Sequence, residues 1–516
     1  MGEPKRPSLK QALVALALIL SACSASPADT DPSIAPASTD ATSTTSSASS
    51  GSTATTSAPA QQGAAGIGDS LFAALGNGGY DVSHYSLDLE FDGETLAGLA
   101  TLRVVPQVLL KSFQLDLTGM TVVGVEIDGK VVGFDLAEEL IVLPAEPLPA
   151  GQAVSVVIDY RGTPSSIPNV AGRFRVGWHK SVDGWFVLSE PAGADTWFPS
   201  NNHPLDKATF SLEVTVPDGL EVVSSGVMTG LDLGTDGATY TWEASDPIAP
   251  YLVALAIGDF DRVEDSTVAG VPVVNYFDRH VGASDRAIFD RQPEMLEFFS
   301  GLFGDYPFDV YGALVLETEQ VPAALETQTL STFGTQILVL GEAVVAHELA
   351  HQWFGDSVSV ADWGDVWLNE GFAIYGQWMW AEYTRGAEAL DGEVVAAYRA
   401  MAGAGLSSAS EAAGYEQARD LFPPPGSPPA DDLFNQSVYL RGGLTLHALR
   451  LRLEDPIFFE LLETWAMEHR HGNARTGDFL ELVEDLGGGE ARALAEDWIF
   501  SSDLPPIDEL GLRPPG

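Results

Sequence analysis

The sequence predicts an α+β protein, in which an antiparallel β domain at residues 67–263 precedes a mainly helical domain at residues 264–500. In the first of these regions, short segments alternate apolar and polar residues, and Gly, Asp and Pro stand between the segments. This pattern is typical of half-buried strands joined by turns. In the second region the apolar residues take helical spacing. A chain of 516 residues is also long enough for two or three domains, each with its own core.

The clearest strand is at residues 84–91, where Tyr85, Leu87, Leu89 and Phe91 share one face and polar residues share the other. One side of this strand is therefore expected to be buried and the other exposed. Short runs of the same kind follow along the chain. We expect these further strands at residues 100–105, 112–117, 122–127, 154–160, 210–216 and 251–257.

The second domain begins with a predicted helix at residues 286–303, whose apolar side chains recur at helical spacing. Residues 310–316 are mostly apolar and indicate a strand. Residues from about 386 to 500 are predicted to be mainly helical, with a proline-rich loop at 423–429. The tail at 501–516 has two Pro pairs and no periodicity, so it is expected either to wrap around the surface or to be loose.

Residues 1–22 have the pattern of an export signal, with a basic start and an apolar run too short to span a membrane stably. The small residues before Cys23 resemble the box of bacterial lipoproteins, in which the cysteine is lipidated and becomes the new N-terminus. The alternative is an ordinary secretory signal with an incidental cysteine. Residues 23–66 are rich in Ser, Thr, Ala and Pro and are predicted to form a disordered tether. We therefore expect an exported protein, lipid-anchored to the cell membrane on its extracytoplasmic side.

Acidic residues far outnumber basic ones, 73 against 25, which gives a formal net charge of -48. A surface this negative repels phosphate backbones, which argues against nucleic acid as a partner. The only cysteine of the chain is Cys23, so an internal disulfide framework is excluded.

The segment H-E-L-A-H at residues 347–351 carries the strongest chemical signal. His347 and His351 are four residues apart, which on a helix puts both rings on one face, within reach of one metal ion. Glu370 follows after eighteen further residues, enough for a second helix to return to the same ion. Two imidazoles and one carboxylate make a zinc site whose fourth position is open to water, and Glu348 stands beside it. H-E-x-x-H also occurs by chance in helices, but the apolar segment before it and the N-E-G around Glu370 favour zinc.

With these motifs the chain resembles the aminopeptidase N family of zinc metallopeptidases, which are gluzincins. The resemblance implies a saddle-like antiparallel β domain followed by a thermolysin-like, mainly helical zinc catalytic domain. It covers residues from about 80 to 500, so we expect the short two-domain form of the family, here as a bacterial lipoprotein. Besides the zinc motif, the matching segments are W-F-P at 197–199, H-P at 203–204, G-D-Y-P-F at 304–308 and V-Y-L-R-G at 438–442.

The resemblance also implies roles for individual residues. Glu326 matches the acidic residue that binds the free α-amine of a peptide, and Glu190 matches a second amine-binding position from the β domain. Tyr439 matches the tyrosine that donates its phenol to the oxyanion. Ala324 and Leu325 stand in the family's Gly-x-Met segment before that acid, where they are expected to bind substrate. The segment departs from the family pattern, because it reads A-A-L-E-T in place of G-x-M-E-N.

The expected function is that of an aminopeptidase with one zinc ion per chain, which hydrolyses the N-terminal bond of peptides with a free N-terminus. Glu348 is expected to be the general base that activates the attacking water. Asp356 and Asp365 are expected to hold the rings of the zinc histidines through hydrogen bonds. Two alternatives stay open, an epoxide or other hydrolase of the same family and a non-catalytic, peptide-binding surface lipoprotein. The sequence does not indicate an oligomeric state.

Overall fold

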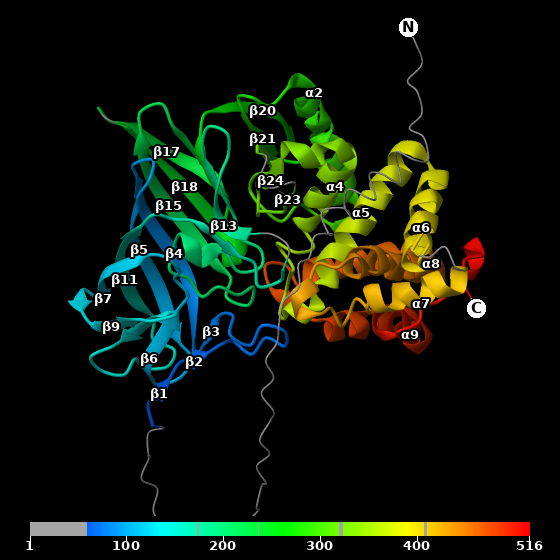
Figure 1. The fold of residues 1–516 in the computed structure, drawn as a ribbon, viewed down its shortest axis with the longest axis horizontal. Helices are drawn as coiled ribbons and strands as arrows, with labels where there is room; N and C mark the ends of the chain where they lie inside the picture. Colours follow the sequence, from blue (N-terminus) through cyan, green and yellow to red (C-terminus); the bar gives the residue numbers. More distant parts are fainter. Residues whose placement is uncertain (1–58, 173–174, 236, 319–322, 407–409, 516) are drawn as a thin grey trace, which may run out of the picture. The chain divides into compact units, whose positions relative to one another are not determined.

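The chain has a β-rich first half and a mainly helical second half, which confirms the predicted α+β class (Figure 1). The predicted export signal, Cys23 and most of the predicted tether lie outside the described residues. The computed structural model describes residues 59–515, apart from 173–174, 236, 319–322 and 407–409.

The β domain is built around an eight-stranded sheet. Its neighbouring strands are antiparallel, except that β15 and β4 run parallel. The alternation seen in the sequence of β4 is explained by burial, because Tyr85, Leu87, Leu89 and Phe91 all point into the core. The strands lie in the order β17 (Val227–Leu233), β18 (Gly237–Ile248), β15 (Ala208–Pro217), β4 (Tyr80–Phe91), β5 (Leu96–Pro106), β11 (Val154–Gly162), β7 (Thr121–Ile127) and β8 (Lys130–Val131).

Smaller sheets complete the β domain. A four-stranded sheet has the order β1 (Gln61–Gln62), β6 (Leu110–Leu115), β10 (Leu140–Leu143) and β9 (Gly133–Leu136). A five-stranded sheet has the order β12 (Ser166–Pro168), β13 (Arg175–Lys180), β14 (Trp185–Leu188), β19 (Leu255–Gly258) and β16 (Glu221–Ser224). A two-stranded sheet pairs β2 (Ala64–Ala65) with β3 (Asn77–Gly78).

Two details of this domain differ from the sequence-based expectation. Strands β1 and β2 lie within the segment predicted as a tether. They form because their main chains pair with β6 and β3, and main-chain pairing does not depend on the composition of the segment. The predicted strand at 251–257 is a strand only in its second half. Its first residues form a 3-10 turn, η2 (Pro250–Leu252), because the proline at its start cannot donate to a sheet.

The second domain begins with a mixed five-stranded sheet. Its order is β20 (Phe260–Val268), β21 (Val271–Asp278), β22 (Ala313–Leu316), β24 (Ser331–Gly334) and β23 (Ala324–Leu325). The expected domain boundary at residues 263 and 264 lies inside β20. Because β20 pairs with β21 as a hairpin, the whole strand belongs to the sheet of the second domain.

Helices make up most of the rest. The predicted helix at 286–303 is shorter than expected, because Pro293 stands in its first turn and a separate 3-10 turn precedes it. None of the helices in the described ranges has both the length and the hydrophobicity needed to cross a membrane. The helices are α2 (Ala283–Arg286), α3 (Gln292–Phe303), α4 (Glu342–His351), α5 (Trp367–Arg385), α6 (Ala387–Met401), α7 (Glu411–Leu421), α8 (Gly442–Glu468) and α9 (Thr476–Phe500).

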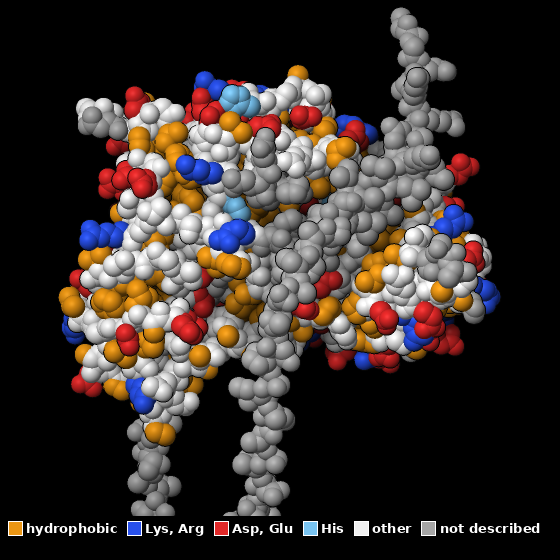
Figure 2. Space-filling model, viewed as in Figure 1, with side chains coloured by type: hydrophobic (Ala, Val, Ile, Leu, Met, Phe, Trp, Pro, Cys, Tyr) orange, Lys and Arg blue, Asp and Glu red, His pale blue; other side chains and the backbone are white. Residues whose placement is uncertain are grey.

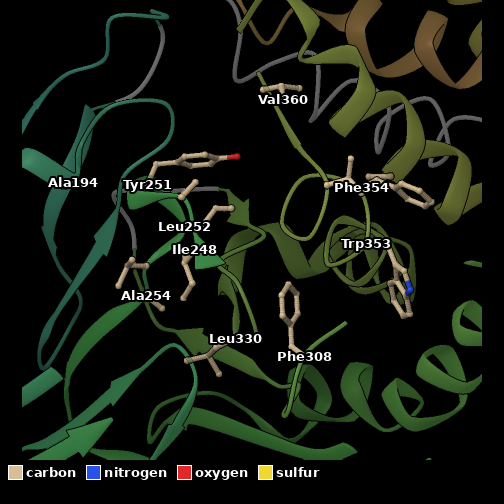
Figure 3. Packing of buried hydrophobic residues seen from close by; sticks show 14 of the residues in the cluster. Ala194, Ile248, Tyr251, Leu252, Ala254, Phe308, Leu330, Trp353, Phe354 and Val360 are labelled. Carbon is tan, nitrogen blue, oxygen red and sulfur yellow. The ribbon is translucent and has the colours of Figure 1, made fainter. Parts of the chain in front are cut away.

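One hydrophobic core runs through both domains. Figure 3 shows part of it, where Ile248 and Leu252 come from the β domain and Leu330 and Phe354 from the second domain.

Polar contacts join the domains as well. The Lys207 ammonium, at the start of β15, donates to the main-chain carbonyls of residues 356 and 357, at 2.6 and 3.0 Å. The β domain is therefore fixed directly against the loop that follows α4.

The tail after α9 packs on the helices rather than extending away from them. Arg441 donates to the carbonyls of Ser501 and Asp503, at 2.7 and 3.2 Å. Leu504 and Ile507 are buried. Of the two arrangements expected for this tail, it therefore adopts the one that wraps around the surface.

Acidic side chains on the face drawn in Figure 2 are spread over many elements and lie among Lys and Arg side chains. The large negative charge of the chain is therefore not gathered into a single patch on that face.

Candidate active site

The predicted metal ligands come together from two helices. Helix α4 presents His347 and His351, whose Nε2 atoms lie 3.1 Å apart. Helix α5 presents Glu370, and its Oε2 atom lies 3.4 Å from the Nε2 atom of each histidine. In a tetrahedral zinc site with bonds of about 2.0–2.2 Å, two ligand atoms are about 3.3–3.6 Å apart. Both distances to Glu370 fall in this range and the distance between the histidines is slightly shorter, so the three side chains converge closely enough to hold a single zinc ion.

Close contacts between backbones set this geometry. A Cβ atom at Gly376 of α5 would lie only 2.7 Å from the Cβ of Ala350 on α4, so a glycine lets the two helices approach. Gly371, which follows Glu370, packs in the same way against Gly442, where a Cβ would lie 2.8 Å from the Gly442 backbone. This second contact brings the segment before α8 against the zinc ligand. The glycine of N-E-G thus has a packing role.

The orientation of the His351 ring is set by the chain that follows it. The Nδ1 atom of His351 lies 3.0 Å from the carbonyl oxygen of Phe354, so Nδ1 carries the proton and Nε2 is free for the metal. The expectation that Asp356 and Asp365 hold the zinc histidines is therefore wrong for this ring. Asp365 instead accepts from the Thr476 hydroxyl at 2.6 Å. The tight turn after α4 places a local carbonyl nearer to the ring than either carboxylate.

The electrostatics of the site are dominated by buried carboxylates. Burial raises the pKa of Glu348, which His351 opposes, while the charges of Glu326 and Glu370 raise it further. Burial also acts to raise the pKa of Glu370, but the neighbouring His351 and His347 outweigh it and hold that pKa at about 2. Ligand atoms of Glu326, Glu348 and His351 all lie within 4.8 Å of one another. So many acidic groups in one buried place are stable together only when cations compensate their charge.

The two predicted amine-binding residues reach this place from different domains. Glu326 follows β23 in the second domain, and Glu190 follows β14 in the β domain. Burial raises the pKa of Glu190, and the charges of Glu326 and Glu370 raise it further, so Glu190 lies near enough to both carboxylates to interact with them. One oxygen of Glu190 and one of Glu326 are buried without a hydrogen-bond partner among the described residues. These two oxygens are free to accept from a cationic ligand.

Gln352 is a site residue that the sequence did not reveal. Its Oε1 accepts from the main-chain N–H of Thr329 at 2.8 Å and from the Tyr306 hydroxyl at 3.1 Å. Its Nε2 donates to the carbonyl oxygen of Glu326 at 3.2 Å. Gln352 directly follows His351, so it ties the zinc helix to the segment that carries Glu326. Its position directly after the H-E-x-x-H motif was the only signal in the sequence for a role at the site. The hydrogen-bond partners of Gln352 are distant in sequence, so the sequence could not indicate what it contacts.

The segment before Glu326 is only partly as expected. Ala324 is half-buried, whereas Leu325 is buried and pairs with Thr332 in the sheet. Because successive side chains of a strand point to opposite faces, Ala324 and Leu325 lie on opposite faces of β23. The Thr327 hydroxyl donates to the carbonyl of Leu330, so it is turned into the protein.

Tyr439 lies beside the predicted metal ligand His347. It belongs to η7 (Ser437–Arg441), a π-helical turn directly before α8, and such turns are frequent at functional sites. Its ring stacks on His347, with 6.2 Å between ring centroids. Burial raises the pKa of Tyr439, and the charges of Glu370 and Glu190 raise it further. The phenol is therefore protonated at neutral pH and able to donate a hydrogen bond.

Tyr251 is a second residue that the sequence did not indicate. It comes from η2 of the β domain, and its ring packs on Trp363 with 5.2 Å between centroids. In Figure 3 its hydroxyl points from the β domain toward the segment that contains Phe354. Burial raises the pKa of Tyr251, and the charges of Glu326 and Glu190 raise it further. Its hydroxyl is buried without a hydrogen-bond partner among the described residues.

A β domain joined to a helical domain with this ligand set defines a zinc metallopeptidase. Residues 288–498 match the model of the peptidase family M1 domain. A solved structure, the M1 zinc metallopeptidase from Deinococcus radiodurans, is 32% identical with a TM-score of 0.77, and the match covers 86% of this chain and 99% of that one. The chain belongs to peptidase family M1. The predicted family, the two-domain fold and the zinc cofactor are thereby confirmed.

A second structure of the same protein and one curated relative match this chain as well. A mutant of the Deinococcus radiodurans enzyme, solved with a Tyr-Ser-Ala substrate, is 31% identical with a TM-score of 0.77, again over 86% of this chain and 99% of that one. Aminopeptidase 2 of Candida albicans is 24% identical over 457 residues, which cover 83% of this chain and 48% of that protein. The chain spans about half the length of the curated relatives it matches.

Proposed function

We propose that the protein is a zinc-dependent aminopeptidase that removes residues from the free N-terminus of peptides. The observation that carries this proposal is the pair Glu326 and Glu190, which offer unpartnered buried oxygens next to the metal ligands. A peptide's N-terminal ammonium supplies the donors and the positive charge that these groups lack. With the ammonium held there, the first peptide bond is the one that lies over the metal ligands.

The residues around the metal ligands supply the remaining chemistry. His347, His351 and Glu370 would hold a zinc ion, which when bound would lower the pKa of water and polarise a carbonyl group. Glu348 takes a proton from the attacking water and delivers it to the amine that leaves. The Tyr439 phenol donates a hydrogen bond to the carbonyl oxygen as its negative charge grows.

The test is to digest one peptide in its free and its N-acetylated form and to identify the products by mass. A charge-assisted contact to the ammonium is worth roughly 1.5–3 kcal/mol. Acetylation or Glu326→Ala should therefore lower kcat/KM by about one to two orders of magnitude, without changing the zinc content. The matched control is Glu388→Ala, which removes an exposed carboxylate of α6 and should keep full activity. Internal fragments from both forms of the peptide would refute the proposal.

The two alternative functions gain no support from the site. A non-catalytic peptide-binding protein has no need of a general base, yet Glu348 is present beside the ligand set. An epoxide substrate has no ammonium, and it would leave the unpartnered oxygens of Glu326 and Glu190 without a donor.

We further propose that the mature protein is exported and anchored to the membrane through lipid on Cys23. The proposal is supported by the export signal at residues 1–22 and by the small residues before the cysteine. Stable anchoring takes two acyl chains, which a diacylglyceryl group provides. The wild-type protein should partition into the detergent phase, and Cys23→Ser should be soluble or unprocessed. Equal membrane retention of both would contradict this proposal.

A further inference from the structure

Two carboxylates of the β domain, the partly buried Asp116 and the buried Asp195, lie close together. Asp116 follows β6, and Asp195 lies in η1 (Ala194–Thr196). Neither forms an ion pair within the described part of the chain. Burial raises the pKa of Asp116 to about 8, with the charge of Asp195 adding to the shift, and burial raises the pKa of Asp195 to about 6. Two such groups are stable in their charged forms only beside a cation.

The Thr118 hydroxyl donates to Oδ2 of Asp195 at 2.5 Å, and three further polar side chains surround the two carboxylates. The Asn202 main-chain N–H donates to Oδ2 of Asp116 at 2.8 Å, and its Nδ2 lies 3.5 Å from Oδ1 of Asp195. The Nδ2 of Asn77 donates to the same oxygen of Asp116 at 3.3 Å. Ser200 is paired with Asp116 in an antiparallel bridge, which puts both side chains on one side of the backbone. Asp116, Asp195, Asn77, Ser200 and Asn202 form the oxygen cluster.

The oxygen cluster contains three acceptors that no described group satisfies. They are Oδ1 of Asn77, Oγ of Ser200 and Oδ1 of Asn202, and all three residues are at most 2% exposed. The Nδ2 groups of both asparagines already face the carboxylates, so their oxygens remain for another partner. A buried acceptor without a donor is costly, and here several acceptors and two carboxylates occupy one place. The arrangement lacks positive charge.

We propose that the oxygen cluster binds a calcium ion, through Asp116, Asp195, Asn77, Ser200 and Asn202. Every ligand is an oxygen, which selects a hard cation and disfavours zinc, which prefers nitrogen and sulfur. Two carboxylates balance the charge of a divalent ion. Ca²⁺ accepts six to eight oxygens in irregular geometry, whereas Mg²⁺ demands a near-ideal octahedron. Asp116 is only partly buried, so an ion can enter from solvent.

The position of the oxygen cluster indicates what the ion would stabilise. On one side, η1 continues from the turn after Glu190, where the Thr196 N–H donates to the Gly193 carbonyl at 3.2 Å. On the other side, the chain from Asn202 leads within five residues to Lys207, which holds the loop after α4. Calcium would therefore stiffen the segment that joins the β domain to the active site. This effect is separate from catalysis.

The first test compares thermal unfolding of the zinc-loaded full chain in CaCl2, in MgCl2 and in NaCl of matched ionic strength. At a calcium concentration about a hundred times Kd, Tm should rise by about 3 °C above the other two salts. Asp195→Asn should abolish the rise. Glu146→Gln, which removes an exposed carboxylate of the same domain, should retain it. Equal shifts with calcium and magnesium, or equal shifts in wild type and Asp195→Asn, would mean general screening of the acidic surface and overturn the proposal.

The second test does not depend on a variant that disturbs folding. Equilibrium dialysis against calcium followed by elemental analysis should give about one calcium per wild-type chain, with the zinc content unchanged. Ser200→Ala removes a single hydroxyl and should weaken calcium binding several-fold. Wild-type protein that retains no calcium at millimolar concentration would overturn the proposal, because Asp116 would then be held neutral by a proton.

Discussion

Replacing Gln352 by Met should weaken the amine-binding end of the site while leaving the metal site intact. Met has nearly the same length but can neither donate nor accept strong hydrogen bonds. The substitution removes three contacts, to the Thr329 N–H at 2.8 Å, the Tyr306 hydroxyl at 3.1 Å and the Glu326 carbonyl at 3.2 Å. All three connect the zinc helix to segments outside it.

The magnitude follows from burial. Gln352 has no exposed surface, so the Thr329 N–H and the Glu326 carbonyl would be left without partners in the interior. Each unsatisfied buried group costs about 1–3 kcal/mol, so the two groups together give a loss of about 2–6 kcal/mol in the free energy of unfolding. Thr329 also has a φ of 69°, a conformation that costs a non-glycine residue about 1 kcal/mol. Without Gln352 the segment from Glu326 to Thr329 is free to relax, and it carries the carboxylate with it.

The assay measures Tm, zinc content, and kcat and KM for a free and an N-acetylated peptide. We expect a lower Tm, about one zinc per chain, and a fall of about tenfold in the preference for the free peptide, because the ammonium contact is weakened. The control is Gln336→Met, which removes one hydrogen bond to the Thr318 carbonyl, at 3.2 Å, and should leave the preference unchanged. An unchanged preference in Gln352→Met would refute the positioning role.

Three further predictions concern the chemistry and its scaffold. Glu348→Gln should lower kcat about a hundredfold or more with zinc retained, whereas His351→Ala should lose the zinc, and elemental analysis beside a rate assay distinguishes the two. Tyr439→Phe should lower kcat by about 10²–10³-fold. Because burial raises the pKa of Tyr439, the wild-type rate should show no loss from ionisation of this phenol up to pH 9. An inflection below pH 9 in the pH–rate profile of the wild type, absent from the profile of Tyr439→Phe, would contradict this prediction. Gly371→Val should lower both Tm and kcat, because a Cβ there meets the Gly442 backbone at 2.8 Å; wild-type values would show that the contact is dispensable.

The sequence by itself determined the parts of the site that depend on local geometry. His347 and His351 share one face of α4 because four residues make about one helical turn. Glu370 was predictable as a ligand because the residues between His351 and Glu370 are enough for a second helix, α5, to bring its side chain back to the same ion. The strands of the β domain were predictable for the same reason, since alternation along β4 records which face is buried. Composition indicated a tether up to residue 66, and this is wrong for residues 61–62 and 64–65, where main-chain pairing makes the strands β1 and β2.

Only the tertiary structure decided which distant segments meet. Glu190 and Glu326 are 136 residues apart by their numbering, and no local pattern records that their charges interact in the folded chain. The same holds for Gln352, whose partner Tyr306 lies 46 residues earlier, and for Asn77, whose partner Asp116 lies 39 residues later. Periodicity reports burial of a face, but a buried polar group is satisfied by whichever group the packing brings to it. The positions of hydrogen-bond partners and compensating charges are therefore properties of the folded chain.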